Sequence, residues 1–312
     1  MAVNWLLAAA LGKWLFYLSL VILPGWLFLR FISRGNDQTW LARAGLLFLV
    51  IALTALLASS LLLIQVGEIN QRGVMGMFDP VMRDILLTTP NGTSLYWRLA
   101  GLLFWSLAIA GLWLPRLLLP LAVLGTVCLA VSFAVTGHVA TLAGISQLFI
   151  VLHIVAVTAW AGSVLLLCFL LRPVPADELA TEQWHDLFRQ YGRLAVPVLA
   201  VMLISGGYLY IQLLGWSVVP DHAYHWLMLG KLVLVAMMLA VAARHKFRLV
   251  PDIQLALMSP GVDEPGVSLR QTALSRMRAS LFVEGMLAVG ILALVAIMTT
   301  FVGPQSLLHQ MN

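Results

Sequence analysis

Long apolar runs are the feature that most limits how this chain can fold. Eight runs of about 20 or more mostly apolar residues follow one another, and about 20 such residues cross the hydrocarbon core of a membrane as a helix. Because lipid offers the backbone no hydrogen-bond partner, each run must bond its own N–H and C=O groups, as a helix does. We therefore predict an all-α fold: a polytopic membrane protein with eight transmembrane helices. The predicted spans are Trp5–Ile32, Trp40–Val66, Leu95–Trp113, Leu117–Val135, Ala143–Leu171, Leu194–Leu214, His225–Ala243 and Leu281–Val302.

The composition and the connections agree with a single membrane unit. Hydrophobic residues make up 62% of the 312 residues and charged residues 10%, whereas a soluble domain carries about 25% charged residues. We predict that residues 1–312 form one transmembrane bundle: two first spans (5–66), an outer loop (67–94) and a core (95–302). The first run is too long for a cleaved signal and lacks a basic segment before it. Within the outer loop, Asp79 followed by Pro80 predicts the start of a short interfacial helix, Asp79–Thr88.

The basic residues predict the orientation. Cytoplasmic loops carry an excess of Lys and Arg. Thirteen basic residues fall in one set of loops: Arg30, Arg34, Arg43, Arg116, Arg172, Arg189, Arg193, Arg244, Lys246, Arg248, Arg270, Arg276 and Arg278. The opposite set holds Arg72, Arg83 and Arg98. We therefore expect the first set to be cytoplasmic and both termini to be periplasmic. Since these charges are dispersed around helix ends, the sequence predicts no nucleic-acid binding.

Histidine and methionine side chains gather on the predicted outer side. They include His138, His222, His225, Met75 and Met77. Imidazole together with thioether favours copper, particularly Cu(I), so we predict an outer copper site from these residues. Two structural alternatives remain open: the histidines of "DHAYHW" could cap a helix, and the methionines of "GVMGMFDP" could pack against the membrane surface. The two cysteines lie in apolar runs without CxxC spacing, which predicts neither a disulfide framework nor a zinc knuckle.

Polar residues inside the predicted spans are a second group of candidates, because such groups are costly in lipid unless they are paired or functional. They are Lys13, His153, Lys231 and Glu284. His153 is seven residues before Trp160, which places the two on one helix face. Both lysines could extend outward to the interface. For Glu284 we expect a structural ion pair with the nearby Arg276 or Arg278.

The chain resembles the copper resistance protein D family of bacterial inner-membrane proteins. The resemblance is carried by "VTGHVATLAGISQLFIVLHIVAVTAWAGSVLLL", "LLTTPNGTSLYWRLAG", "YGRLAVPVLAVMLISGGYLY", "YHWLMLGKLVLVAMMLAVAARHKFRLVP" and "SRMRASLFVEGMLAVGILALVAI". It covers about residues 86–301, and His138, His153, Trp160, Lys231 and Glu284 stand at motif positions. It implies copper handling at the inner membrane beside a periplasmic copper-binding partner of the copper resistance C type.

We accordingly expect a multi-pass inner-membrane protein, surrounded by membrane lipid, that transports copper from periplasm to cytoplasm and is not an enzyme. Outer Met and His groups would capture the ion, and His153 would act as the intramembrane relay. No GxxxxGK[ST] loop is present, which argues against a primary pump. The His-x6-Trp helix and the Lys231 helix also resemble membrane protoporphyrinogen oxidases that bind haem b. A haem b- or quinone-linked redox protein using His153 and Lys231, such as a copper reductase, is therefore the alternative. A docking module for the periplasmic copper protein is a third hypothesis.

Overall fold

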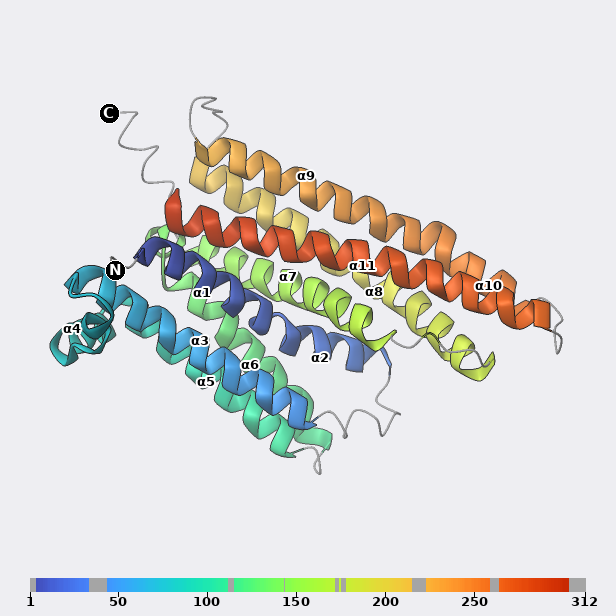
Figure 1. The fold of residues 1–312 in the computed structure, drawn as a ribbon, viewed down its shortest axis with the longest axis horizontal. Coiled ribbons are helices and arrows are strands. Elements are labelled where there is room, and N and C mark those ends of the chain that lie inside the picture. Colours follow the sequence, from blue (N-terminus) through green and yellow to red (C-terminus); the bar gives the residue numbers. More distant parts are fainter. Residues whose placement is uncertain are drawn as a thin grey trace.

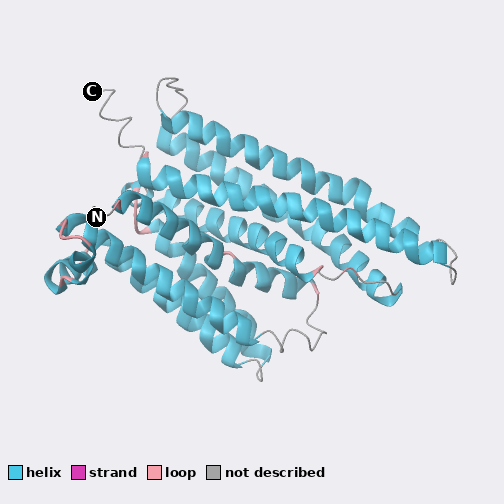
Figure 2. Ribbon diagram, viewed as in Figure 1, coloured by secondary structure: helices cyan, strands magenta, loops and turns pink. Residues whose placement is uncertain are grey.

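The computed structural model describes residues 4–33, 44–111, 115–142, 144–171, 174, 178–214, 223–258 and 264–302. Within these ranges the secondary structure is helical and contains no strand, as Figure 2 shows. The long helices lie side by side in one bundle (Figure 1). The all-α prediction is therefore confirmed.

The helices follow one another along the chain with short connections. Three short elements are not α-helices: the 3-10 helices η2 (Val74–Phe78) and η4 (His138–Thr141), and the π-helical turn η5 (His245–Leu249). The α-helices are α1 (Trp5–Leu20), α2 (Ile22–Ile32), α3 (Ala44–Asn70), α4 (Pro80–Leu87), α5 (Pro90–Ala110), α6 (Pro115–Ala134), α7 (Gly144–Leu170), α8 (Glu178–Leu214), α9 (Ala223–Arg244), α10 (Val250–Met258) and α11 (Glu264–Phe301). Helices α9, η5 and α10 run on without interruption, so three labels describe one long helix.

Seven helical segments among the described residues are long and apolar enough to cross a membrane. They correspond to seven of the eight predicted spans. The remaining prediction, Leu95–Trp113, falls on α5 and on residues 112–113, which lie outside the described ranges. Helix α5 begins at Pro90, its first turns read PNGTS, and it is not among these seven segments. Helix α5 nevertheless lies beside α6 in the bundle (Figure 1). The prediction of eight spans is thus confirmed for seven.

The first span is interrupted once and contacts α7 at the level of its backbone. Pro24 has no N–H for the carbonyl of Leu20, and the regular helix gives way to a turn at Val21. One turn further on, Gly25 of α2 faces Gly162 of α7. A Cβ atom at either glycine would overlap the backbone of the opposite helix. Only residues without a side chain allow α2 and α7 to approach this closely.

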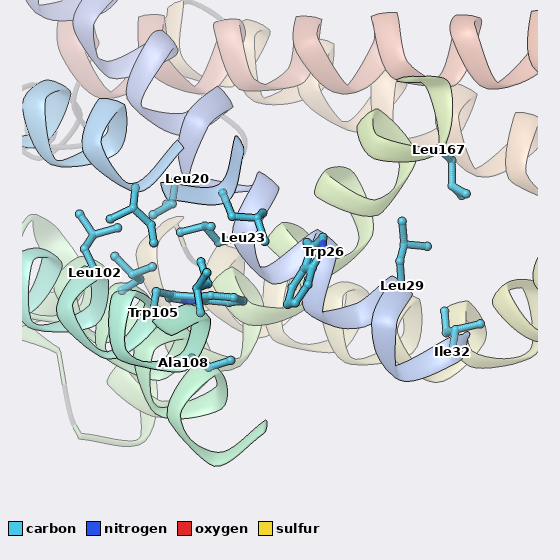
Figure 3. Packing of buried hydrophobic residues seen from close by; sticks show 14 of the residues in the cluster. Leu20, Leu23, Trp26, Leu29, Ile32, Leu102, Trp105, Ala108 and Leu167 are labelled. Carbon is cyan, nitrogen blue, oxygen red and sulfur yellow. The ribbon is translucent and has the colours of Figure 1, made fainter. Parts of the chain in front are cut away.

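The largest hydrophobic cluster joins the first span to α5. Leu20, Leu23 and Trp26 point toward Leu102 and Trp105 in Figure 3. The indole rings of Trp26 and Trp105 meet edge to face, with centroids 6.1 Å apart and planes at 69°. Such tilted contacts are the favoured geometry for aromatic pairs. Buried leucines of α7 and α11 extend this cluster across the bundle.

A short amphipathic helix follows α3 at one end of the bundle. Helix α4 begins as the sequence predicts: the Asp79 carboxylate accepts hydrogen bonds from the N–H groups of Val81 and Met82, and Pro80 takes the first helical position. The Asn70 side chain donates to the same carboxylate over 2.9 Å. These donors, the Met82 N–H foremost, hold the pKa of Asp79 below its ordinary value. The predicted helix at Asp79–Thr88 is confirmed.

This end of the bundle also holds the start of α1 and the end of α11 (Figure 1). The Lys13 ammonium of α1 donates to the Thr299 carbonyl of α11 over 2.8 Å, so the two helices run antiparallel. We call this the α4 end of the bundle. The sequence predicts that it faces the periplasm.

Candidate intramembrane relay site

His153 lies near the middle of α7, about 14 Å from the start of that helix at Gly144. Its ring faces α8, where Nδ1 lies 3.0 Å from the Met202 carbonyl oxygen and 3.2 Å from Ser205 Oγ. The Ser205 hydroxyl already donates to the Val201 carbonyl of its own helix. Both neighbours of Nδ1 are therefore hydrogen-bond acceptors.

This geometry fixes the tautomer of the ring. A carbonyl oxygen can only accept, so Nδ1 carries the hydrogen, and in the neutral ring Nε2 keeps its lone pair. Nε2 has no hydrogen-bond partner within the described part of the chain. A neutral imidazole held through Nδ1 by a backbone carbonyl is the usual arrangement of a metal-binding histidine.

Glycine on α8 makes room for the ring. A Cβ atom at Gly206 would stand 2.9 Å from His153 Cε1 and 3.3 Å from Nδ1. At the next residue, Gly207, a Cβ atom would meet nothing within 4 Å. The two glycines are therefore not equivalent: Gly206 accommodates the imidazole, and Gly207 does not.

Seven residues further along α7, Trp160 lies on the same helix face as His153, as predicted from their spacing. The Trp160 side chain is buried in a cluster with Met202 of α8 and Met238 of α9. Two thioether side chains thus lie in the cluster around Trp160, and neither was a sequence-based candidate ligand. Lys231 lies on α9, whereas the ring nitrogen of His153 bonds to α8.

Glu284 belongs to a second polar group further along α7, α8, α9 and α11. Its carboxylate is 1% exposed, and Oε2 lies 3.2 Å from Nδ1 of His245. The expected ion pair with Arg276 or Arg278 is therefore wrong. Both arginines are exposed on α11, whereas the Glu284 side chain turns inward toward the π-helical turn.

A cavity of about 200 Å³ lies against this second group. Glu284 and His245 line it, together with Trp160 and Tyr191. The Tyr191 hydroxyl lies 3.0 Å from Ser163 Oγ, ten residues and about 15 Å beyond His153 on α7. The exposed Lys246 and Phe247 complete the wall, so the cavity reaches the surface at the end of the bundle opposite α4.

Those of the predicted outer ligands that the structure describes lie at the α4 end but do not form one site. Met75 is 80% exposed, and Met77 packs over Gly67 beside the Trp5 ring. His225 is buried in the first turn of α9, with its ring edge-on to Tyr224. His138 lies in η4, and its side chain is outside the described part. His222 is outside it altogether.

The described residues contain no group of three or more His, Cys, Asp or Glu side chains placed to hold a metal. A second cavity of about 260 Å³ does lie at the α4 end, lined by Lys13, Glu68 and Arg98. The Arg98 guanidinium stacks on the Phe16 ring at 4.7 Å. This cavity lies between α1, α3 and α5, apart from the face of α7 that carries His153.

Sequence reasoning missed four residues of the relay region: Met202, Ser205, His245 and Tyr191. Met202, Ser205 and Gly206 are three and four residues apart on α8, which places them on one helix face. A serine, a glycine and a methionine on one face of an apolar helix are a detectable signal for a close polar approach. For His245 no such periodic signal exists, because a π-helical turn does not follow the 3.6-residue period.

The fold and these polar groups define a class: a multi-pass helical membrane protein with buried polar side chains between its helices. The model for copper resistance protein D matches residues 185–298, and the model for the copper resistance protein D-like N-terminal domain matches residues 2–148. A copper resistance protein D of Pseudomonas syringae pv. tomato is 28% identical over 218 residues, covering 67% of this chain and 70% of that protein. No solved structure matches the chain.

The chain therefore belongs to the copper resistance protein D family. The resemblance found in the sequence is confirmed, as are a role in copper resistance and a place in the inner membrane as a multi-pass protein. The family is defined by copper resistance and is no known class of enzyme.

Proposed function

We propose that this protein carries copper across the inner membrane from periplasm to cytoplasm, with His153 as the relay ligand inside the bilayer. The observation that carries the proposal is the His153 ring itself. Its Nδ1–H is held by the Met202 carbonyl, which leaves Nε2 as a neutral, unprotonated nitrogen in the middle of α7. An unprotonated nitrogen of this kind is ready to bind a metal cation without first losing a proton.

The surroundings of the ring suit Cu(I) as the transported ion. Met202 and Met238 are buried in the cluster around Trp160, on the same face of α7 as His153, and thioether sulfur is a soft ligand. A ladder of sites that each bind briefly is what transport requires, since a complete coordination sphere would retain the ion. One imidazole with adaptable methionines fits that requirement.

Capture at the α4 end is the second part of the proposal. His138 stands just before α7, so copper held there would be passed directly to the helix that carries His153. The predicted topology puts four more candidate ligands on the same side of the membrane: His222, His225, Met75 and Met77. The exposed Met75 is accessible to a donor protein. We propose a periplasmic copper-binding protein of the copper resistance C type as that donor.

The bundle works as one unit in this proposal. The largest hydrophobic cluster contains residues from α1 through α11, so the N-terminal helices support α7 and do not form a separate module. Helix α5 is included as an eighth span. The α4 end is assigned to the periplasm because of the thirteen-to-three distribution of basic residues.

The test is His153→Leu in purified protein reconstituted into vesicles. The substitution removes the ligand and a buried polar group together, so the thermal stability should be unchanged or slightly raised. Copper uptake should be lost. Thr158→Val is the matched control: it also removes a buried polar atom from α7, but Thr158 Oγ1 donates only to carbonyls of its own helix.

Each other outcome has a clear meaning. A folded His153→Leu protein with full copper uptake would make His153 a packing residue and end the relay proposal. A Soret band in the parent that disappears together with activity would assign His153 to haem. Uptake only into vesicles with the α4 end inside would reverse the proposed direction.

A further inference from the structure

Glu284 is a buried carboxylate that the relay does not use. It is 1% exposed, and its Oε1 has no hydrogen-bond partner among the described residues, while Oε2 meets His245. Carboxylates are rarely buried without full pairing, because the charge loses its hydration. The unpaired oxygen therefore marks a place where something else must be accommodated.

The imidazole beside it can change its protonation without breaking its contacts. His245 Nδ1 faces Glu284, and Nε2 lies 2.8 Å from the buried Ser280 hydroxyl. A hydroxyl group both donates and accepts, so Ser280 can bond to Nε2 whether or not that nitrogen carries hydrogen. The chain Glu284–His245–Ser280 can hold or release one proton and stay fully connected.

The local backbone places His245 at this point. Residues 245–249 form a π-helical turn within the long helix of α9 and α10. Such turns are frequent at functional sites, and they rotate the following residues relative to a regular α-helix. The cavity of about 200 Å³ along Glu284 has room for several water molecules, and its wall reaches the exposed Lys246. Protons can therefore reach the pair from the end of the bundle opposite α4.

From these observations we propose that Glu284 and His245 form a proton-binding site that copper must pass on its way to the cytoplasm. The inference rests on the proposed transport function. In the deprotonated state the pair is a carboxylate beside a neutral imidazole, which attracts a copper cation leaving the His153 level. In the protonated state its charge is neutral, and that attraction is gone.

The proton balance is simple. Oε1 or His245 accepts a proton from cavity water, and the same proton returns to cavity water when a copper cation arrives. No electron moves, and no net proton crosses the membrane. The other titratable groups that line the cavity with Glu284 are Tyr191 from α8 and Lys246 from the π-helical turn, while the Cys168 thiol of α7 donates to the Leu281 carbonyl of α11.

A proton fits this site better than a resident metal ion. The described residues here supply one imidazole and one carboxylate, and no third His, Cys, Asp or Glu joins them as a metal-binding group. A stable metal site in a protein commonly has three or four ligands. A proton needs a single acceptor with a hydrogen-bond partner, which is what the pair provides.

The first arm of the test is infrared difference spectroscopy of the purified full-length protein between alkaline and acidic buffer. The parent should show a protonated-carboxyl band that appears on acidification and shifts in D2O. Every acid that titrates between the two buffers contributes to this band, so the Glu284 component is the part that is missing in Glu284→Gln. Glu182→Gln, a control at an exposed acid of α8, should keep that component. Should Glu284→Gln fail to fold, His245→Gln must move the pH at which the band appears.

The second arm measures copper uptake by vesicles as a function of internal pH. Uptake by the parent should fall as the interior is acidified, approaching about tenfold per pH unit, the limit for one competing proton. Glu284→Gln should show the same uptake at every internal pH. An identical protonated-carboxyl band in the parent and in Glu284→Gln would overturn the proton site. Copper uptake by the parent that does not change with internal pH would do the same. Neither result would touch the relay proposal, which depends on His153→Leu.

Discussion

Gly206 allows the relay geometry to be tested without removing any polar atom. In Gly206→Ala, the new Cβ would stand 2.9 Å from His153 Cε1, closer than carbon atoms approach in proteins. The imidazole must retreat by about half an ångström to regain ordinary van der Waals contact. Because the Nδ1–Met202 carbonyl distance is 3.0 Å, this displacement brings the hydrogen bond to the limit of its range.

The magnitudes follow from two opposing effects. Losing the hydrogen bond costs about 1 kcal/mol. Replacing glycine by alanine within a helix contributes about 1 kcal/mol in the other direction. Gly206→Ala should therefore leave the free energy of unfolding nearly unchanged, whereas Gly207→Ala, where a Cβ meets nothing, should raise it by about 1 kcal/mol.

Copper transport should separate the two variants more clearly than stability does. With Nδ1 no longer held, the ring loses the preference for leaving Nε2 free, and about 1 kcal/mol corresponds to roughly fivefold lower uptake. Vesicle uptake and thermal unfolding, measured side by side, give both quantities. Equal uptake by Gly206→Ala, Gly207→Ala and the parent would refute the reasoning. Equal impairment of both variants would point to a general defect of α8.

Three further predictions concern the two ends of the bundle. A cysteine in place of Arg72 should react with a membrane-impermeant thiol reagent in intact cells, and one in place of Gln183 should react only after lysis; the reverse pattern would invert the orientation. His138→Ala should weaken copper binding measured by equilibrium titration, while His185→Ala should not; parental affinity in both would remove His138 from the capture site. The depressed pKa of Asp79 predicts that this cap stabilises α4 above the ordinary carboxyl pKa and loses its effect as pH falls through the folded-state value. The protection factors of the α4 amides, which are exchange rates corrected for the intrinsic effect of pH, should therefore fall in acid in the parent. In Asp79→Asn, which keeps an accepting oxygen, the protection factors should not change with pH; an equal fall in acid would contradict the cap.

Helix positions were predictable from the sequence because apolar length alone decides what can cross a membrane. Helix α4 was predictable for a different reason: Asp79 and Pro80 determine where it begins through contacts within a few residues. Helix α5 begins at Pro90 with a polar first turn and is not among the seven segments that length and hydropathy identify, so the eighth span stays a prediction. The identity of His153 and Glu284 as unusual residues was also predictable, because a polar group in an apolar run is conspicuous.

The partners of these residues were not predictable. His153 bonds to a backbone carbonyl of α8, and every residue has a carbonyl, so the sequence holds no sign of which one is used. Glu284 was assigned to the arginines nearest in sequence, but the structure pairs it with His245, which is brought inward by a π-helical turn. The outer Met and His residues share a chemistry, yet Met77 packs against Gly67 while Met75 points away. The residue types indicated side chains that suit copper, but they did not show which of these side chains lie together.

The contact between Gly25 and Gly162 holds α7 firmly against the N-terminal helices. With no side chains between them, α2 and α7 have no layer that could slide, so α7 is anchored to the N-terminal helices along one side. Its other side faces α8, which contains Pro197 in its interior, and beyond α8 and α11 lies α9 at the edge of the bundle (Figure 1). Only 6% of the most apolar stretch of the α9–α10 span is buried. If the protein transports copper as proposed, the helices that move to open the proposed relay to each side of the membrane are therefore α8 and α9, while α7 stays in place.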